Sequence, residues 1–194
     1  GSNFVLDWFN RSEEAVISLD LLTYAGNLDN LSSLDNHPRH HFVQGNIGNR
    51  NLVSNLLKNY KIRAIVNFAA ETHVDRSIHD SKNFIETNIV GTYNLLESAR
   101  AYWNNLKQDF RFLHISSDEV YGSLDMSDQP SNERDPYRPN SPYSASKACC
   151  ELVIDSYRNS FFNVEKYDQH KLKGKGFWSS ITNLIIHDHT LEIQ

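Results

Sequence analysis

The sequence is poor in cysteine, in long apolar runs and in excess positive charge. Its only cysteines, Cys149 and Cys150, are adjacent, which suits neither a disulfide framework nor a spaced metal site. We therefore expect no metal and a reducing, cytoplasmic location. No apolar run approaches the roughly 20 residues of a membrane-spanning helix. With 19 basic and 24 acidic residues, the chain also lacks the strongly basic face that favours nucleic-acid binding.

What is present is the composition of a globular chain. The 194 residues are 39% hydrophobic and 22% charged, which supports a buried core in about one domain. The chain opens on Gly1-Ser2, and its single methionine is Met126. Such an opening fits either a remnant of tag cleavage or a sequence whose natural start lies further upstream.

Strand-like and helix-like segments alternate along the chain. Apolar runs predict strands, and apolar residues at helical spacing predict helices. Strands are expected at 15–20, 41–44, 64–68, 110–116 and 180–186, helices at 49–59, 81–103 and 143–158, and a polar loop at 123–142. Strands separated by helices indicate βαβ units. The expected fold is an α/β, doubly wound parallel sheet with helices on both faces.

The strongest local signal for chemistry is Tyr143 followed by Lys147. Residues at i and i+4 share one face of a helix. A lysine ammonium beside a phenol favours the phenolate and lowers its pKa from about 10 toward the working range. Such a tyrosine can take a proton from an alcohol while a nicotinamide takes the hydride. The same spacing also occurs on ordinary exposed helices, so neighbouring motifs must decide.

Ser117, Asp118 and Glu119 directly follow an apolar strand. The carboxyl ends of parallel strands are where α/β folds bind ligands. A serine hydroxyl there can bond a substrate oxygen and complete a Ser-Tyr-Lys set. Two adjacent carboxyls can divide the work of acid and base if their surroundings separate their pKa values. The alternative for this acidic pair is a solvated turn or a helix cap.

Two further strand ends carry features of a dinucleotide site. Asp20 closes its strand, where a carboxylate can bond both hydroxyls of an adenosine ribose and would repel the extra phosphate of NADP. The alternative is an ordinary turn residue. Ala69 and Ala70 follow the strand expected at 64–68, and small residues there let a cofactor approach the backbone. These features favour NAD.

Five separated motifs occur in the order typical of one protein family. They are LTYAGNL at 22–28, FAAETHVDRS at 68–77, ETNIVGT at 86–92, SDEVYG at 117–122 and SPYSASKA at 141–148. With these motifs, residues 1–160 resemble the extended short-chain dehydrogenase/reductases, and within them the dTDP-glucose 4,6-dehydratases. The resemblance implies a Rossmann-like fold, NAD as cofactor, a nucleotide-sugar substrate and a homodimer.

The same resemblance implies roles for individual residues. Tyr143 would accept the proton of the sugar 4-hydroxyl while NAD takes the C4 hydride, and Lys147 would tune Tyr143 and hold the nicotinamide ribose. Glu119 would remove the C5 proton and Asp118 would protonate the departing 6-hydroxyl, after which the hydride returns to C6. Thr72 and Ser117 would lie near the sugar. The cofactor-binding positions would be Gly1, Asp20, Asn46, Ile47, Ala69, Ala70, Thr87, Tyr143 and Lys147.

The match has gaps at both ends. The family's glycine-rich phosphate loop should follow a first strand, and Gly1 resembles its third glycine. The first strand and two glycines are then missing, which should weaken cofactor binding and favours missing sequence over a tag remnant. Leu21 replaces the usual lysine, and Asn46 the usual aspartate. We expect an incomplete NAD-binding domain at 1–160, a tail of unknown structure at 161–194, and no C-terminal substrate domain.

Several functions remain open at this point. The leading one is NAD-dependent dehydration of dTDP-glucose to dTDP-4-keto-6-deoxyglucose. A UDP-sugar 4,6-dehydratase shares the run from Asp118 to Gly122, whereas a sugar-nucleotide 4-epimerase eliminates nothing and lacks the acidic pair. From another class, the chain is a non-catalytic remnant that at most dimerises. For the chain as given, we expect weak or no NAD binding and no turnover.

Overall fold

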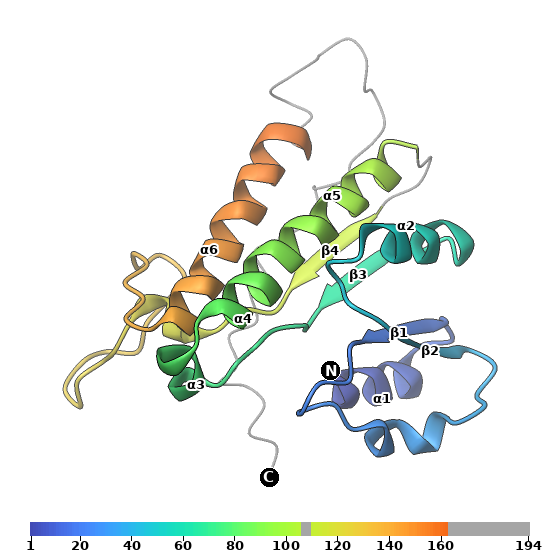
Figure 1. Cartoon of the computed structure of the whole chain (residues 1–194), viewed down its shortest axis with the longest axis horizontal. Coiled ribbons are helices and arrows are strands. Elements are labelled where there is room, and N and C mark those ends of the chain that lie inside the picture. Colours follow the sequence, from blue (N-terminus) through green and yellow to red (C-terminus); the bar gives the residue numbers. More distant parts are fainter. Residues whose placement is uncertain (106–109, 163–194) are drawn as a thin grey trace.

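The computed structural model describes residues 1–105 and 110–162 as alternating helices and strands (Figure 1). The predicted strand at 180–186 and nearly all of the predicted tail lie outside the described residues. The elements in chain order are α1 (Ser2–Arg11), β1 (Val16–Asp20), η1 (Leu28–Leu34), β2 (His40–Gln44), α2 (Arg50–Asn59), β3 (Ala64–Asn67), α3 (Val74–His79), α4 (Lys82–Phe84), η2 (Ile85–Gly91), α5 (Thr92–Trp103), β4 (Arg111–His114), η3 (Asp118–Tyr121), α6 (Pro142–Tyr157) and η4 (Arg158–Phe162).

Most of the predicted elements are confirmed. The strands expected within residues 1–162 are β1 to β4, and the helices expected at 49–59 and 143–158 are α2 and α6. The helix expected at 81–103 is helical throughout but contains a π-helical segment, η2, between α4 and α5. The elements α3 and η1 were not expected. The helical backbone continues past residue 160 to Phe162 in η4.

The strands form two parallel pairs. In one pair Val16 of β1 lies opposite His40 of β2, and in the other Ala64 of β3 lies opposite Arg111 of β4. Among the described residues, no ladder of hydrogen bonds joins the two pairs. In the strand order 3-2-1-4-5-6 of dinucleotide-binding folds, these pairs are the ones that flank the first strand. This agrees with the predicted absence of that strand.

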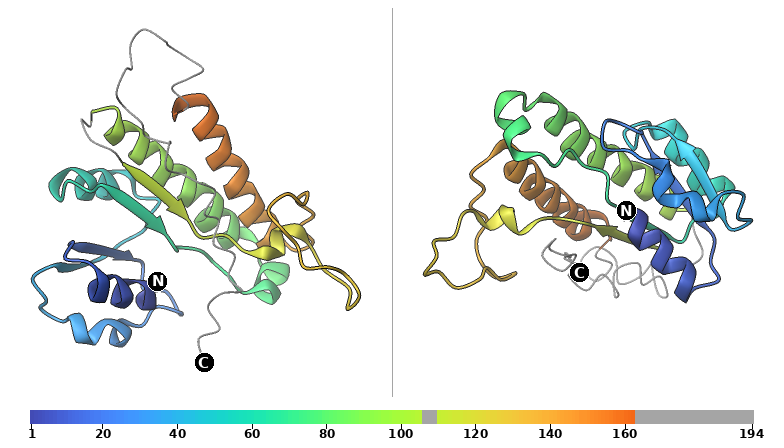
Figure 2. Two further views of the ribbon diagram at one scale, coloured as in Figure 1. Left: turned by 180° about the vertical axis from the view of Figure 1, so that it is seen from behind. Right: turned by 90° about the horizontal axis from the view of Figure 1, so that it is seen from below.

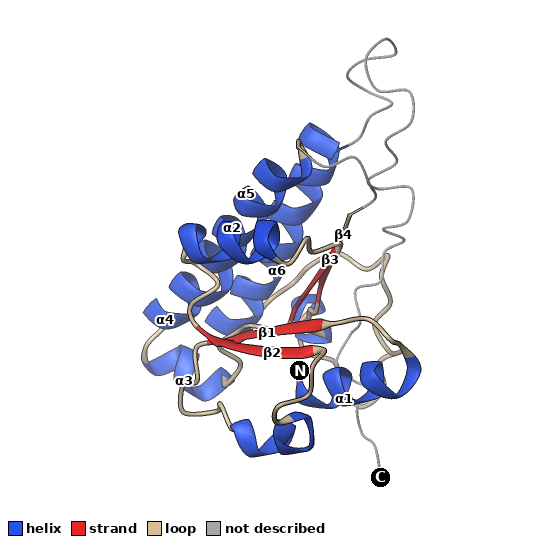
Figure 3. Cartoon of the chain, turned by 90° about the vertical axis from the view of Figure 1, so that its right-hand side faces the viewer, coloured by secondary structure: helices blue, strands red, loops and turns tan. Residues whose placement is uncertain are grey.

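The hydrophobic core lies between the strands and a layer formed by α2, α5 and α6. Figures 1 and 2 show α5 and α6 side by side, with α5 next to β4, and Figure 3 shows α1 on the opposite side of the β1–β2 pair from α2. No described helix is long and apolar enough to span a membrane. The buried cluster consists of Val53, Leu57, Leu95, Leu96, Ala99, Tyr102, Trp103, Phe110, Phe112 and Tyr157.

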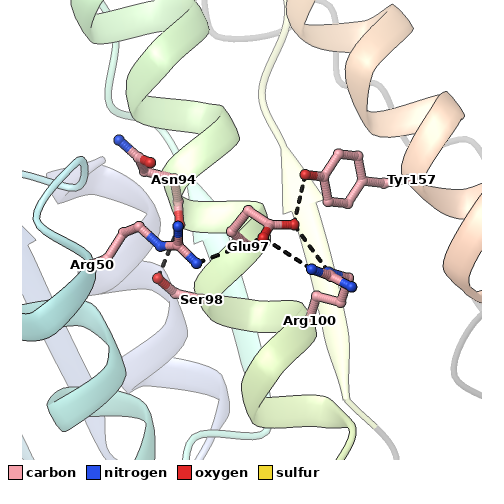
Figure 4. A network of polar contacts seen from close by, with 6 residues as sticks. All are labelled: Arg50, Asn94, Glu97, Ser98, Arg100 and Tyr157. Carbon is pink, nitrogen blue, oxygen red and sulfur yellow. Dashed lines mark hydrogen bonds and ion pairs between the residues drawn. The ribbon is translucent and has the colours of Figure 1, made fainter.

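A polar network on the outer side of this core joins the three helices (Figure 4). The Glu97 carboxylate of α5 accepts hydrogen bonds from Arg100 at 3.0 Å and from the Tyr157 hydroxyl of α6 at 2.7 Å. Arg50 of α2 lies 3.6 Å from the same carboxylate. The pKa of Glu97 is lowered, mainly by Arg100 and also by Tyr157. One carboxylate therefore connects α2, α5 and α6.

Candidate active site

Helix α6 begins at a strong start signal that aims its first turns at the strand ends. The hydroxyl of Ser141 accepts a hydrogen bond from the Ser144 amide at 3.0 Å, the Ser144 hydroxyl accepts one from the Ser141 amide, and Pro142 occupies the first turn. Such a capping box satisfies amides that have no partner within the helix. The face that follows carries Tyr143 and Lys147, both buried.

Tyr143 is anchored to the segment that follows β3. Its backbone amide donates to the Ser77 hydroxyl of α3 at 3.1 Å, and its ring meets Phe84 edge to face with centroids 6.4 Å apart. The Ser77 hydroxyl in turn donates to the Val74 carbonyl at 2.6 Å. The first turn of α6 is therefore fixed against the loop and short helix that contain the FAAETHVDRS motif.

Lys147 is directed beneath the end of β4. Its ammonium, in a side chain only 4% exposed, donates to the Ile115 carbonyl at 2.6 Å and lies 3.4 Å from Nε2 of His114. Burial, reinforced by the Lys147 charge, lowers the pKa of His114 to about 3. A neutral imidazole removes the repulsion that a second buried cation would create next to the Lys147 ammonium.

The acidic pair lies in η3, which residues 115–117 connect to the end of β4. The buried Ser117 hydroxyl accepts the Glu119 amide at 3.3 Å and so caps η3, and it lies 3.5 Å from a carboxylate oxygen of Asp118. The helix cap that was one alternative for this segment is therefore present, but the side chain that forms it is that of Ser117 and not that of an acidic residue. Burial first, and the Asp118 carboxylate second, raise the pKa of Glu119. Glu119 is accordingly a stronger base than an exposed glutamate.

The positions matched to the cofactor, apart from Tyr143 and Lys147, fall into two groups. In the first group, Asn46 and Thr87 line one cavity of about 280 Å³ between the loop after β2 and η2. The Asn46 side chain accepts the Gly48 amide at 2.7 Å. Buried Ile47 lies against Gly91, where an added Cβ would meet its side chain at 3.1 Å. The structure thus brings Asn46, Ile47 and Thr87 together.

The second group lies at the ends of β1 and β3. Asp20 is exposed, and its carboxylate accepts the Leu22 amide at 2.7 Å, so it serves as the turn residue considered above. Gly1, the N-cap of α1, lies beside Phe68. The Ala69 amide donates to the Asn67 side chain at 3.2 Å, which fixes the start of the loop that continues through Ala70 to Thr72.

Asn88 organises this loop, and sequence reasoning missed it. The fully buried side chain accepts the Glu71 amide at 2.8 Å, and donates to the Glu71 carbonyl at 3.0 Å and to the Ser146 hydroxyl at 2.8 Å. It thereby joins the loop that carries Thr72 to η2 and α6. The signal in the sequence that could have identified it is a single asparagine among apolar residues at helical spacing. In residues 1–105 and 110–162, no three His, Cys, Asp or Glu side chains are grouped to hold a metal ion.

Comparison with known proteins agrees with this arrangement. Residues 1–165 match the family model described as GDP-mannose 4,6 dehydratase. The chain belongs to this family. A dTDP-glucose 4,6-dehydratase of Xanthomonas campestris is 48% identical over 165 residues, which are 83% of this chain and 46% of that protein. The chain spans about half the length of the curated relatives that it matches.

Similar solved structures confirm the predicted Rossmann-like α/β fold. DesIV of Streptomyces venezuelae, a dTDP-glucose 4,6-dehydratase solved with NAD and TYD bound, has a TM-score of 0.74 and 43% identity over 83% of this chain and 49% of its own. A UDP-glucose 4-epimerase of Thermus thermophilus in complex with NAD has a TM-score of 0.70 and 28% identity, over 83% and 48% of the two chains. The domain boundary at residue 160 stays a prediction.

Proposed function

We propose that the protein carrying this chain is an NAD-dependent nucleotide-sugar 4,6-dehydratase that acts on dTDP-glucose. The observation that carries the proposal is the acidic pair Asp118–Glu119 in a capped turn directly after β4, beside the helix of Tyr143 and Lys147. When a nicotinamide accepts the hydride, an alcohol oxidation requires only the tyrosine and lysine from the protein. Two carboxyls at the same strand end supply the acid and base that the loss of water requires.

The residues at the carboxyl edge fit NAD by the chemistry of their groups. Asp20 offers an acceptor for a ribose diol, Asn46 and Thr87 line a polar cavity, and Ala69 and Ala70 leave the backbone approachable. NAD, when bound, would take a hydride from the sugar and return it. Tyr143 and Lys147 would hold the nicotinamide ribose, and the buried Lys147 side chain is fixed by its hydrogen bond to the Ile115 carbonyl.

The protein's own groups then move protons. Tyr143 takes the proton of the 4-hydroxyl as C4 is oxidised, and the new ketone makes the C5 hydrogen acidic. Glu119 removes that C5 proton, the C6–oxygen bond breaks, and Asp118 gives the departing hydroxyl the proton that makes it water. In the final step C6 regains a hydride and C5 a proton. Thr72 and Ser117 orient the sugar through their hydroxyls.

The assignment of base to Glu119 rests on the resemblance together with its raised pKa, whose causes are burial and Asp118. A raised pKa also suits an acid, so the two carboxyls need separate tests. We expect Glu119→Gln to keep NAD binding and the oxidation step while losing proton exchange at C5. We expect Asp118→Asn to keep C5 exchange and slow the release of water. The reverse pattern would exchange the two roles.

The function itself is tested by supplying the purified full-length protein that carries this chain with NAD and dTDP-glucose, UDP-glucose or GDP-mannose. The product is followed by the absorbance that a 4-keto sugar develops in alkali. We expect turnover of dTDP-glucose above that of the other two sugars. Faster turnover of UDP-glucose would favour the UDP-sugar dehydratase. A product that keeps its 6-hydroxyl and differs only in the configuration at C4 would show an epimerase and refute the proposal.

We also propose that the protein is a cytoplasmic homodimer that pairs through α5 and α6. Support comes from large apolar side chains exposed on this part of the surface, including Ile85, Tyr93, Leu152 and Phe161. Both cysteines are free thiols, as expected in a reducing compartment. Light scattering should give twice the mass of one chain, and Leu152→Glu should reduce it to one mass.

A further inference from the structure

A third side chain continues the Tyr143–Lys147 face of α6. Glu151 stands at the next i+4 position of the helix and is only 4% exposed. Its carboxylate accepts hydrogen bonds from the Ser116 hydroxyl and, at 2.8 Å, from the Tyr137 hydroxyl. The mechanism above gives this buried carboxylate no role.

The two partners of Glu151 lie on either side of the acidic pair. Ser116 precedes Ser117 at the end of β4. Tyr137 lies in the loop that joins η3 to α6, in the part that leads back to α6, residues 137–141, which we call the return arm. Its ring stacks on that of Tyr121, the last residue of η3, with ring centroids 5.9 Å apart. Bonds from one carboxylate therefore reach the segment before η3 and the ring that covers its end.

Two backbone contacts tighten the return arm against η3. The Arg138 amide donates to the Val120 carbonyl at 3.0 Å. Gly122 adopts a φ of 92°, and an added Cβ there would lie 2.5 Å from the Arg138 carbonyl oxygen. With Tyr137 held by Glu151, the turn of the acidic pair is enclosed between α6 and this arm.

The energetics favour a geometric role for Glu151. A buried carboxylate costs free energy that its hydrogen bonds only offset, and apolar replacements of such groups are often as stable. Tyr137 stays protonated and able to donate, because burial and the neighbouring Glu151 carboxylate raise its pKa. A directed acceptor fixes two hydroxyls at defined positions, which an apolar side chain of similar size does not.

We propose that Glu151 is a positioning residue that holds the Asp118–Glu119 turn in place through Ser116 and Tyr137. The role in catalysis rests on the proposed dehydratase function. In an active enzyme, loss of Glu151 would then impair removal of the C5 proton and water, while Tyr143 and Lys147 would still support oxidation at C4. Misplacement of a catalytic group by about 1 Å costs roughly 100-fold in rate.

The test uses the pKa of Glu119, measured without substrate, as an indicator of the position of the turn. Glu119 responds to burial and to Asp118, so displacement of the turn should lower its pKa toward that of an ordinary glutamate. The carboxyl carbons of 13C-labelled glutamates are titrated by NMR, and Glu119→Gln assigns the resonance. The variants are Glu151→Leu and Glu151→Gln, which lose the same charge but differ in hydrogen bonding.

We expect Glu151→Leu to lower the pKa of Glu119 and Glu151→Gln, which retains a hydrogen-bonding side chain, to lower it distinctly less. Equal shifts in both would assign the effect to charge alone and overturn the proposal, as would no shift in either. Glu97→Gln is the matched control, because Glu97 also accepts a tyrosine hydroxyl but lies in another network. It should leave the pKa of Glu119 unchanged.

Tyr137→Phe covers the case in which Glu151→Leu does not fold. It keeps the carboxylate and deletes one bond, so a smaller shift in the same direction is expected, and no shift would refute the positioning role.

This titration is independent of turnover. A full-length wild-type protein that dehydrates no sugar would refute the proposed function alone. In an active enzyme, Glu151→Leu should lower kcat about 100-fold with little change in KM and unchanged C4 oxidation.

Discussion

The Tyr157 hydroxyl gives a test of the network around Glu97 (Figure 4) by removal of one atom. Tyr157→Phe deletes the O–H that donates to Glu97 at 2.7 Å. The ring can keep its contacts with Tyr93 and Phe161. Hydrogen bonds to charged groups contribute about 1.5–3 kcal/mol. Arg100, whose side chain is 34% exposed, still pairs with the carboxylate after the substitution. We therefore expect a loss at the lower end of this range, about 1.5 kcal/mol, in the free energy of unfolding.

Urea unfolding at neutral pH measures this loss, with Tyr60→Phe as the control. The Tyr60 side chain is 43% exposed, and surface changes of this kind usually stay within about 0.5 kcal/mol. Equal unfolding free energies for Tyr157→Phe and Tyr60→Phe would refute the view that the network stabilises the packing of α5 against α6.

The same network predicts how the difference depends on pH. Because Arg100 and Tyr157 lower the pKa of Glu97 in the folded state, the unfolded chain binds more protons in the acid range, and stability rises with pH there. The contribution of Glu97 is present above the ordinary glutamate pKa of about 4.3 and is lost as the pH falls through the lowered value. The penalty of Tyr157→Phe should therefore shrink in that acid window. A penalty that stays constant would contradict a charge-assisted bond.

Three further substitutions have defined outcomes. Gly122→Ala should destabilise the protein by about 1–3 kcal/mol, because it strains a positive φ and pushes a methyl group to 2.5 Å from the Arg138 carbonyl; chemical denaturation measures this. Lys147→Met should raise the pKa of His114 from about 3 but leave it below its ordinary value, since burial is the larger cause; NMR titration of the imidazole checks it. Asn88→Ala should cost at least about 2 kcal/mol in urea unfolding, because it removes two hydrogen bonds to the part-buried Glu71 backbone and one to the buried Ser146 hydroxyl.

The sequence was most informative where the backbone pattern and the chemistry repeat locally. Each strand could be found from a short apolar run, and the acidic pair could be placed at the end of β4 because the pair follows the run directly. The Tyr143–Lys147 spacing required only a helix. These inferences use neighbours within a few positions, which the sequence displays without any knowledge of tertiary contacts.

Long-range contacts were less accessible. Glu151 is one acid among many on helical segments, and only the fold shows that Ser116 and Tyr137 meet it. The role of Asn88 is also long-range, because its partner Glu71 lies 17 positions earlier and bonds through its backbone. The Asp20 carboxylate could be read as either ligand or turn residue, and the Leu22 amide now engages it.

The π-helical winding of η2 (Ile85–Gly91) has a consequence for how this region can change length. A π-helical turn holds one residue more than an α-helical turn, so deletion of one residue within η2 can be absorbed by conversion to ordinary α-helix while α5 keeps the same face toward the core. Deletion of one residue from the first turn of α5 has no such reserve and would rotate the rest of that helix by about 100°, which would turn Leu95 and Leu96 away from the core. This region can therefore lose one residue in η2 but none in α5, provided that Thr87, which lines the cavity, is kept.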